Sequence, residues 1–261
     1  MHVHTTHLGC ADNPNLVMVH GWGMNAAILH LLAERLSQRF HIHLPDLPGH
    51  GKNTPYTPSD MPLDDWADAL AEAIPQPAVW LGWSLGGMLA LRIAARRHQQ
   101  IKALVLLAAT PSFVIRKNWP HGVDSKILAD FQRAISTDPV KALNRFAALQ
   151  VRGDAQAGRQ LRSLRKHLST APLPEKQALA DGLRILEEAD LREDLTHLRQ
   201  PILTVLGSQD PLMPAASGDA MQRLNSNVHV EILPETAHLP FLSQMQRLAQ
   251  RITHFLNTVN P

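Results

Sequence analysis

A single serine, Ser84, stands between two glycines in the stretch GWSLG, at Gly82 to Gly86. An apolar run precedes it from Val79, and a helix-like pattern follows from Leu85 to Arg97. A strand, a sharp turn and a helix in this order present a nucleophilic serine, and the glycines remove Cβ atoms that would collide in the turn. The spacing predicts nucleophilic catalysis by Ser84, near a helix N-terminus that favours negative charge.

A serine hydroxyl is a weak nucleophile, so a base must accept its proton and an acid must orient that base. His238 lies in LPETAHLPF, just after a strand-like run, and Asp210 lies in LGSQDPLMP, at the carboxyl end of the run Ile202 to Leu206. Glu235 is an alternative acid, but it lies only three residues before His238. We predict a triad of Ser84, Asp210 and His238.

The oxyanion of such a reaction must be held by backbone N–H groups. The amide of Leu85, directly after the serine, is one candidate. The stretch VMVHGWGMNA offers a second at Trp22, with glycines at 21 and 23 that permit a turn. We expect His20, in the same stretch, to be structural.

Three aromatic residues are candidates for the walls of an apolar acyl pocket. Trp22 and Trp83 flank the predicted nucleophile, and Phe146 lies on a helix-like segment farther along the chain. Helices also need apolar residues for their own core, so the alternative to a pocket role for Phe146 is packing within the helical segment.

Six short apolar runs end in turn residues and alternate with amphipathic segments. Continuous runs of this kind suit strands buried on both faces of a parallel sheet, and the alternation predicts a mostly parallel, doubly wound α/β sheet. The runs cover residues 15–21, 40–46, 78–84, 101–109, 201–210 and 228–235.

The alternation is interrupted between residues 112 and 190, where four helix-like segments follow one another without a strand-like run. We interpret 112–190 as a helical cap over the carboxyl edge of the sheet, where open α/β folds bind ligands. Residues 1–111 and 191–261 are then the α/β core.

Composition excludes several other classes of protein. The 261 residues contain no apolar run long enough to cross a membrane and no signal-peptide pattern, so we expect a cytoplasmic protein without membrane contact. Cys10 is the only cysteine, which excludes an internal disulfide. The histidines of HVHTTH (2–7) and HIH (41–43) lie in a tail and a strand-like segment, so we expect no metal and no cofactor.

The net charge is +2, and the charge is unevenly spread. Residues 141–176 carry eight Lys or Arg and two acidic residues, which leaves the rest of the chain at −4. The small net charge argues against nucleic-acid binding. The local excess of positive charge in residues 141–176 suits an acidic protein partner. We expect the chain to work as a monomer.

The motifs HGWGMN, LPDLPGHG, LGWSLGGMLA, GSQDPLMP and ETAHLPF, in this order, resemble the α/β-hydrolase superfamily from end to end. Trp22, Trp83, the run ATPSF…W (109–119) and RFAALQ resemble its pimeloyl-acyl carrier protein methyl ester esterases of biotin synthesis. The resemblance implies a cap after the sixth strand and a carboxylesterase that releases methanol. It also assigns the triad to Ser84, Asp210 and His238.

The resemblance further implies that acyl carrier protein is the partner. Lys141, Arg145 and Arg162 match cap arginines that meet the carrier protein in related esterases, and Arg159 matches with a displacement of one position. Lys141 keeps the charge but not the bidentate geometry of arginine. Two alternatives remain: a broad carboxylesterase for short acyl esters without a carrier protein, and a binding protein that has lost its chemistry.

Overall fold

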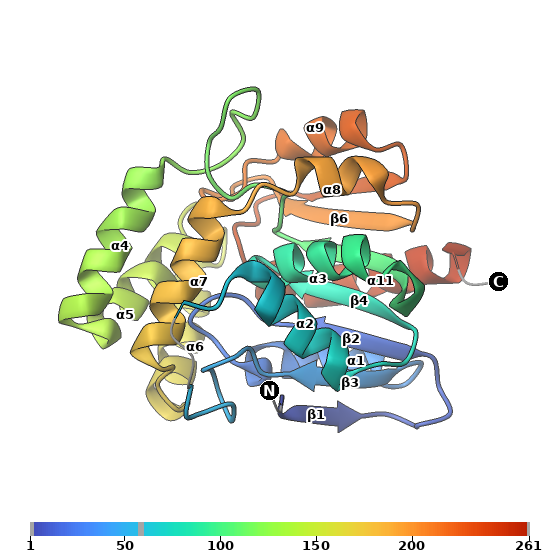
Figure 1. The fold of residues 1–261 in the computed structure, drawn as a ribbon, viewed down its shortest axis with the longest axis horizontal. Helices are drawn as coiled ribbons and strands as arrows, with labels where there is room; N and C mark the ends of the chain where they lie inside the picture. Colours follow the sequence, from blue (N-terminus) through green and yellow to red (C-terminus); the bar gives the residue numbers. More distant parts are fainter. Residues whose placement is uncertain (1–2, 57–59, 260–261) are drawn as a thin grey trace.

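The computed structural model describes residues 3–56 and 60–259, and within them seven strands form one sheet in the order β1-β3-β2-β4-β5-β6-β7 (Figure 1). Residues 1–2, 57–59 and 260–261 of the predicted core lie outside the described residues. β1 is antiparallel to β3, and all other neighbours are parallel. The strands are β1 (Thr5–Leu8), β2 (Asn15–Val19), β3 (His41–Pro45), β4 (Ala78–Trp83), β5 (Ile101–Leu107), β6 (Ile202–Gly207) and β7 (Val228–Leu233).

The central strands are almost entirely buried because both faces of the sheet are covered: every residue of β4 and β6 is buried, and in β5 all but Lys102 are buried. Val17 of β2 belongs to one hydrophobic core with α2 (Leu63–Ala73) and α3 (Leu85–Arg96). Its neighbour Leu16 belongs to a second core with α1 (His30–Leu36) and α11 (Met245–Val259). Successive side chains of a strand point to opposite faces, so an uninterrupted apolar run supplies both cores.

The remaining short helices join these layers. They are η1 (Ala26–Leu29), η2 (His98–Gln100), α8 (Arg192–His197), α9 (Ser217–Leu224) and α10 (Pro240–Ser243). α8 packs against α3 and α9, on the face of the sheet that α3 covers.

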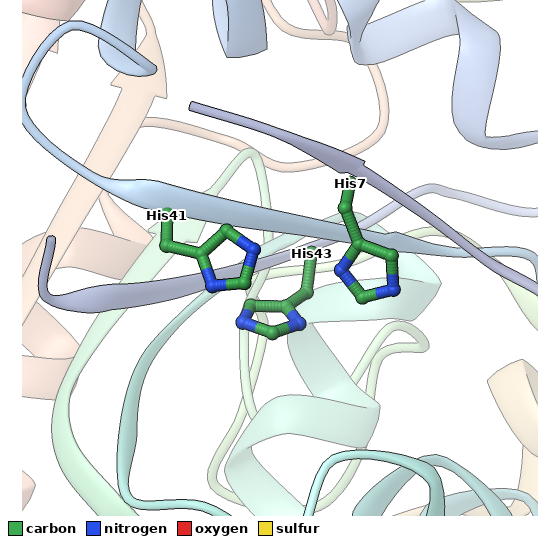
Figure 2. A group of neighbouring side chains, drawn as sticks. All are labelled: His7, His41 and His43. Atoms are coloured by element: carbon green, nitrogen blue, oxygen red, sulfur yellow. The ribbon is translucent and has the colours of Figure 1, made fainter. Parts of the chain in front are cut away.

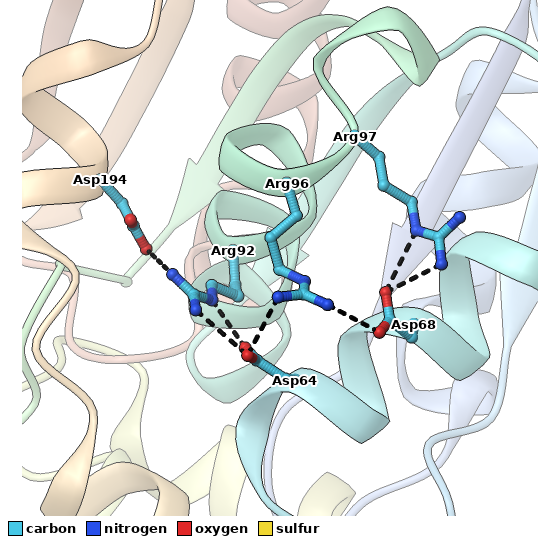
Figure 3. A network of polar contacts seen from close by, with 6 residues as sticks. All are labelled: Asp64, Asp68, Arg92, Arg96, Arg97 and Asp194. Carbon is cyan, nitrogen blue, oxygen red and sulfur yellow. Dashed lines mark hydrogen bonds and ion pairs between the residues drawn. The ribbon is translucent and has the colours of Figure 1, made fainter.

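Polar contacts also fasten α2, α3 and α8 together (Figure 3). Arg92 of α3 makes two hydrogen bonds with Asp64 of α2, at 2.7 and 3.1 Å, and one with Asp194 of α8, at 2.8 Å. The Arg92 guanidinium lowers the pKa of the Asp64 carboxyl. Since Arg92 bridges two acids from different helices, the network fixes how the helices on this face lie against one another.

Four helices between β5 and β6 gather at one end of the sheet (Figure 1). They are α4 (Ser125–Thr137), α5 (Pro139–Gln150), α6 (Ala157–Thr170) and α7 (Lys176–Glu188). Asp124 and Asp138 cap α4 and α5 by accepting the amides of Lys126 and Lys141. All four helix-like segments expected between 112 and 190 are therefore helices, although the bounds of the predicted cap stay a prediction.

All six predicted strands are present, and the doubly wound, mostly parallel sheet is confirmed. β1 differs from the expectation, since the sequence predicts no strand there and places residues 2–7 in a tail. The helical insertion follows β5, the fifth strand, and not the sixth as expected. Among the described residues, only the four-residue strand β1 and its turn precede β2. The strand before the insertion is therefore the fifth along the chain.

Candidate active site

Ser84 lies in the sharp turn between β4 and α3, in a strained backbone conformation with φ 54° and ψ −119°. A Cβ on Gly82 would lie 2.2 Å from the Gly86 carbonyl oxygen, and one on Gly86 would lie 2.4 Å from that of Val19. Both contacts are with backbone atoms, which cannot rotate away. The expected collision within the turn is confirmed for Gly82, whereas a Cβ on Gly86 would collide with the end of β2. Positive φ at a non-glycine residue is a strain found at functional sites.

The structure brings Ser84, His238 and Asp210 together. His238 Nε2 lies 3.0 Å from Ser84 Oγ, and its Nδ1 lies 2.8 Å from Asp210 Oδ2. All three are buried, with His238 fully inaccessible. A histidine between a hydroxyl and a carboxylate, each within hydrogen-bond distance, has the geometry of a base that accepts the serine proton while the acid holds its tautomer.

The second oxygen of Asp210 fixes the carboxylate. Asp210 Oδ1 accepts the amides of Leu212 and Met213 at 2.8 and 3.0 Å, which leaves Oδ2 for His238. The alternative acid, Glu235, is exposed on the turn after β7. The geometry therefore favours Asp210 as the partner of His238.

The loop that carries His238 is held by the last residue of α5 and by the connection between α5 and α6. The His238 amide donates to the Gln150 carbonyl at 3.1 Å, and the Ala237 amide donates to Asp154 Oδ2 at 2.9 Å. The Trp83 indole donates to the His238 carbonyl at 2.9 Å. Sequence reasoning missed Gln150 and Asp154, and no spacing in the sequence signals contacts between residues so far apart.

The turn after β2 lies against the serine. A Cβ on Gly21 would lie 3.0 Å from the Trp83 ring and 3.3 Å from Ser84 Cβ. In the described part of the chain, the backbone amides of Trp22 and Leu85 donate no hydrogen bond. Two free amides close to a nucleophile are what an oxyanion site requires.

Two buried histidines hold this turn in place. His20 donates through Nδ1 to the Gly21 carbonyl and accepts the Leu47 amide at Nε2, both at 2.9 Å. His50 accepts the Gly23 amide at 3.3 Å. Burial lowers the pKa of each to about 3, so both are neutral and can accept these amides. The expectation that His20 is structural agrees with these bonds, whereas His50 was missed.

The predicted aromatic wall divides into two groups. The Trp22 indole lies between helices of the insertion: it donates to the Leu179 carbonyl at 2.9 Å and meets Phe146 edge-on, with 4.9 Å between ring centroids. Trp83 instead meets Phe241, at 5.0 Å. All four rings are buried, Trp22 and Phe146 in one hydrophobic core and Trp83 and Phe241 in the other.

The four predicted carrier-binding residues, Lys141, Arg145, Arg159 and Arg162, are exposed on α5 and α6. The Arg145 guanidinium stands 5.2 Å from the centre of the Phe131 ring. Phe131 in turn contacts Phe146 at 5.3 Å between centroids. A chain of aromatic contacts thus runs from the basic surface to Trp22.

The alpha/beta hydrolase family matches residues 16–251, and the chain belongs to that family. Within it, the chain is 41% identical over 248 residues to the pimeloyl-[acyl-carrier protein] methyl ester esterase of Xylella fastidiosa (strain M23), covering 94% of this chain and 96% of that relative. It is 38% identical over 261 residues to the protein of the same name from Stenotrophomonas maltophilia (strain K279a), covering 100% and 98%.

Solved structures support the fold. An esterase from Exiguobacterium antarcticum superimposes with a TM-score of 0.87 at 20% identity, over 98% of this chain and 95% of that chain. A bromoperoxidase from Bacillus anthracis gives 0.86 at 19%, over 98% and 95%. Since a fold hosts several activities, this likeness does not choose among them. No helix among the described residues is both long and apolar enough to span a membrane.

Proposed function

We propose that this protein is a serine carboxylesterase that hydrolyses the methyl ester of pimeloyl-acyl carrier protein and releases methanol in biotin synthesis. The observation that carries the proposal is His238 within 3.0 Å of Ser84 and 2.8 Å of Asp210. Relatives of that name, about 40% identical over almost the whole chain, support the choice of substrate.

The proposed mechanism uses only groups of this chain. Ser84 Oγ attacks the ester carbonyl while His238 Nε2 takes its proton, and Asp210 stabilises the imidazolium. The oxyanion is held by the amides of Trp22 and Leu85. His238 then protonates the departing methoxide, and a water activated by the same histidine hydrolyses the acyl-enzyme. The step needs neither a metal nor a cofactor.

We assign the acyl pocket to Trp22, Trp83 and Phe146. Gln150 adds a polar candidate, because its side-chain amide is buried and has no hydrogen-bond partner among the described residues. A buried amide without a partner is destabilising unless a ligand or water satisfies it. We propose that a polar group of the bound acyl chain or of its phosphopantetheine arm does so.

We propose that residues 112–190 form a cap and that its basic surface receives the acidic carrier protein. Lys141, Arg145, Arg159 and Arg162 are all exposed and available for such contacts. Charges at the rim of an interface raise the association rate and orient the partner. Arg145, fixed over Phe131, offers the most preorganised of these guanidinium groups.

A groove beside these residues suits the phosphopantetheine arm. It has a volume of about 420 Å³, lies between α5 and α6, and has Arg165 and Lys166 on its wall. Its apolar residues Leu143, Leu168 and Leu173 also line a separate small cavity of about 10 Å³ beside Gly23, next to the oxyanion turn. The groove therefore lies on the basic surface and shares part of its wall with the region of the oxyanion turn.

Methanol release tests the proposal, measured with the methyl ester of a pimeloyl chain on acyl carrier protein and with the same chain on a small thiol. We expect a large preference for the carrier-bound ester that falls as salt is added, because salt screens charge steering. Equal rates on both substrates at low salt would contradict the role of the carrier protein.

Reversing the charge of single arginines tests where the carrier protein contacts this chain. Arg145→Glu and Arg162→Glu are expected to lower kcat/KM for the carrier-bound ester about tenfold or more, with little change on the small ester. Lys102→Glu is the matched control, since Lys102 is an exposed cation at the amino end of β5, away from the site. An equal loss in all three variants would argue against a defined docking surface.

The alternatives give different results. A broad carboxylesterase for short acyl esters would hydrolyse both substrates equally and would tolerate both arginine reversals. A binding protein without chemistry would leave Ser84 unlabelled by a fluorophosphonate, whereas an esterase is labelled about once per chain. The monomeric state, the cytoplasmic location and the lack of contact with nucleic acid or membrane stay predictions.

A further inference from the structure

Three histidines meet on the outer pair of strands, at the edge of the sheet (Figure 2). His7 of β1 lies directly opposite His43 of β3 in the antiparallel register. His41 precedes His43 by two residues, so both side chains point to the same face of the sheet. The ring centroids lie 4.4 Å apart for His41 and His43, 4.9 Å for His7 and His43, and 5.6 Å for His7 and His41.

Each of these rings offers a nitrogen, and the three nitrogens all lie within 4.8 Å of one another. Among the described residues, this is the one place where three or more His, Cys, Asp or Glu side chains meet with such spacing. We propose that His7, His41 and His43 bind a divalent transition-metal ion of the zinc type.

The chemistry of the donors selects the class of ion. Three imidazoles and no carboxylate favour Zn²⁺, Ni²⁺ or Cu²⁺ over Mg²⁺ or Ca²⁺, which prefer oxygen. Three histidines with water in the fourth position are an established zinc arrangement. His43 is buried and His7 is exposed, so one ligand is held rigidly while the open side of the site faces solvent.

A neighbouring amide orients two of the ligands. Asn15 Oδ1 lies 3.2 Å from His41 Nδ1 and 2.9 Å from His43 Nε2. A group that accepts a hydrogen bond from one ring nitrogen sets the tautomer and leaves the other nitrogen for the metal. For His43, the nitrogen left for the ion is Nδ1.

The site is separate from the predicted active site. β1 and β3 lie on one side of β2, whereas Ser84 follows β4 on the other side. His41 is the first residue of β3, and the serine lies past the carboxyl end of its strand. A bound ion would join the edge strand β1 to β3, and would therefore add stability without taking part in hydrolysis.

Titration of tag-free protein with Co²⁺ and Zn²⁺ tests the proposal, by visible absorption for Co²⁺ and by calorimetry for Zn²⁺. We expect about one ion per chain with a micromolar or lower Kd, and a Co²⁺ spectrum of nitrogen coordination. His7→Gln is expected to raise Kd at least tenfold. His254→Gln, at an exposed histidine of α11, is the matched control and should leave Kd unchanged.

Because His7 is exposed, its substitution does not depend on repacking a core, and unchanged ester hydrolysis would verify that the variant is folded. The proposal is overturned if the unaltered chain binds less than half an equivalent of Zn²⁺. It is also overturned if His7→Gln and His254→Gln bind Zn²⁺ with the same affinity.

Discussion

Replacing Gly82 by alanine tests whether close backbone packing positions the serine. The new Cβ would lie 2.2 Å from the Gly86 carbonyl oxygen and 2.5 Å from Gly87 Cα. An ordinary contact needs more than 3 Å, so the strand end and the start of α3 must separate by about 1 Å. A misplacement of that size costs about 100-fold in rate, and overpacking costs about 1–3 kcal/mol of folding free energy.

The assay is kcat/KM on a short chromogenic ester, together with thermal unfolding. Gly82→Ala is expected to lose about 100-fold in kcat/KM and several degrees in Tm. Gly158→Ala is the control, since the nearest atom to its new Cβ is a mobile arginine nitrogen at 3.8 Å. In helix α6 that change should leave the activity intact and add up to about 1 kcal/mol of stability. A folded Gly82→Ala protein with unaltered kcat/KM would refute the reasoning.

Three further outcomes are expected. Asp210→Asn should lower kcat on the same ester about 10³- to 10⁴-fold, because His238 loses its tautomer partner. Gln150→Leu should raise the free energy of unfolding in urea by about 1 kcal/mol, since a buried unpaired amide is removed, while KM for the carrier-bound ester increases. Burial lowers the pKa of His20 and His50 to about 3. Near pH 6.5 these two histidines become protonated in the unfolded chain but stay neutral in the folded chain. Their contribution to the free energy of unfolding is therefore fully present above pH 6.5. It then falls toward pH 3, by up to about 1.4 kcal/mol per pH unit for each histidine. Urea unfolding between pH 7 and 5 measures that slope, which His50→Asn should reduce.

The buried strands were predictable because their signal is local. A strand covered on both faces is mostly apolar, and β4, β5 and β6 carry such runs, interrupted by Lys102 in β5 and Thr204 in β6. Ser84 and Asp210 follow from these runs, since ligands of an open α/β sheet meet at the carboxyl ends of its strands. The choice of Asp210 over Glu235 also follows from the sequence, because Glu235 lies only three residues before His238, and the 2.8 Å contact of Asp210 with His238 agrees with it.

β1 was not predictable for the opposite reason. Its sequence, TTHL, has no buried position, so neither an apolar run nor an alternation marks it. Only its pairing with β3 makes it a strand, and that pairing joins residues more than thirty positions apart. The histidine cluster was missed with it, because His7 meets His43 only when the two strands pair.

The supports of the predicted active site are equally invisible in sequence, because each is a polar contact between distant segments. Gln150 and Asp154 accept amides of the His238 loop, and the Ala155 amide donates to the Glu235 carbonyl. The connection between α5 and α6 is thus part of the frame that places the base, not merely a cover. Any movement of the helical insertion that admits a substrate must therefore leave this connection in place, since separating it would remove the bonds that hold His238 against Ser84.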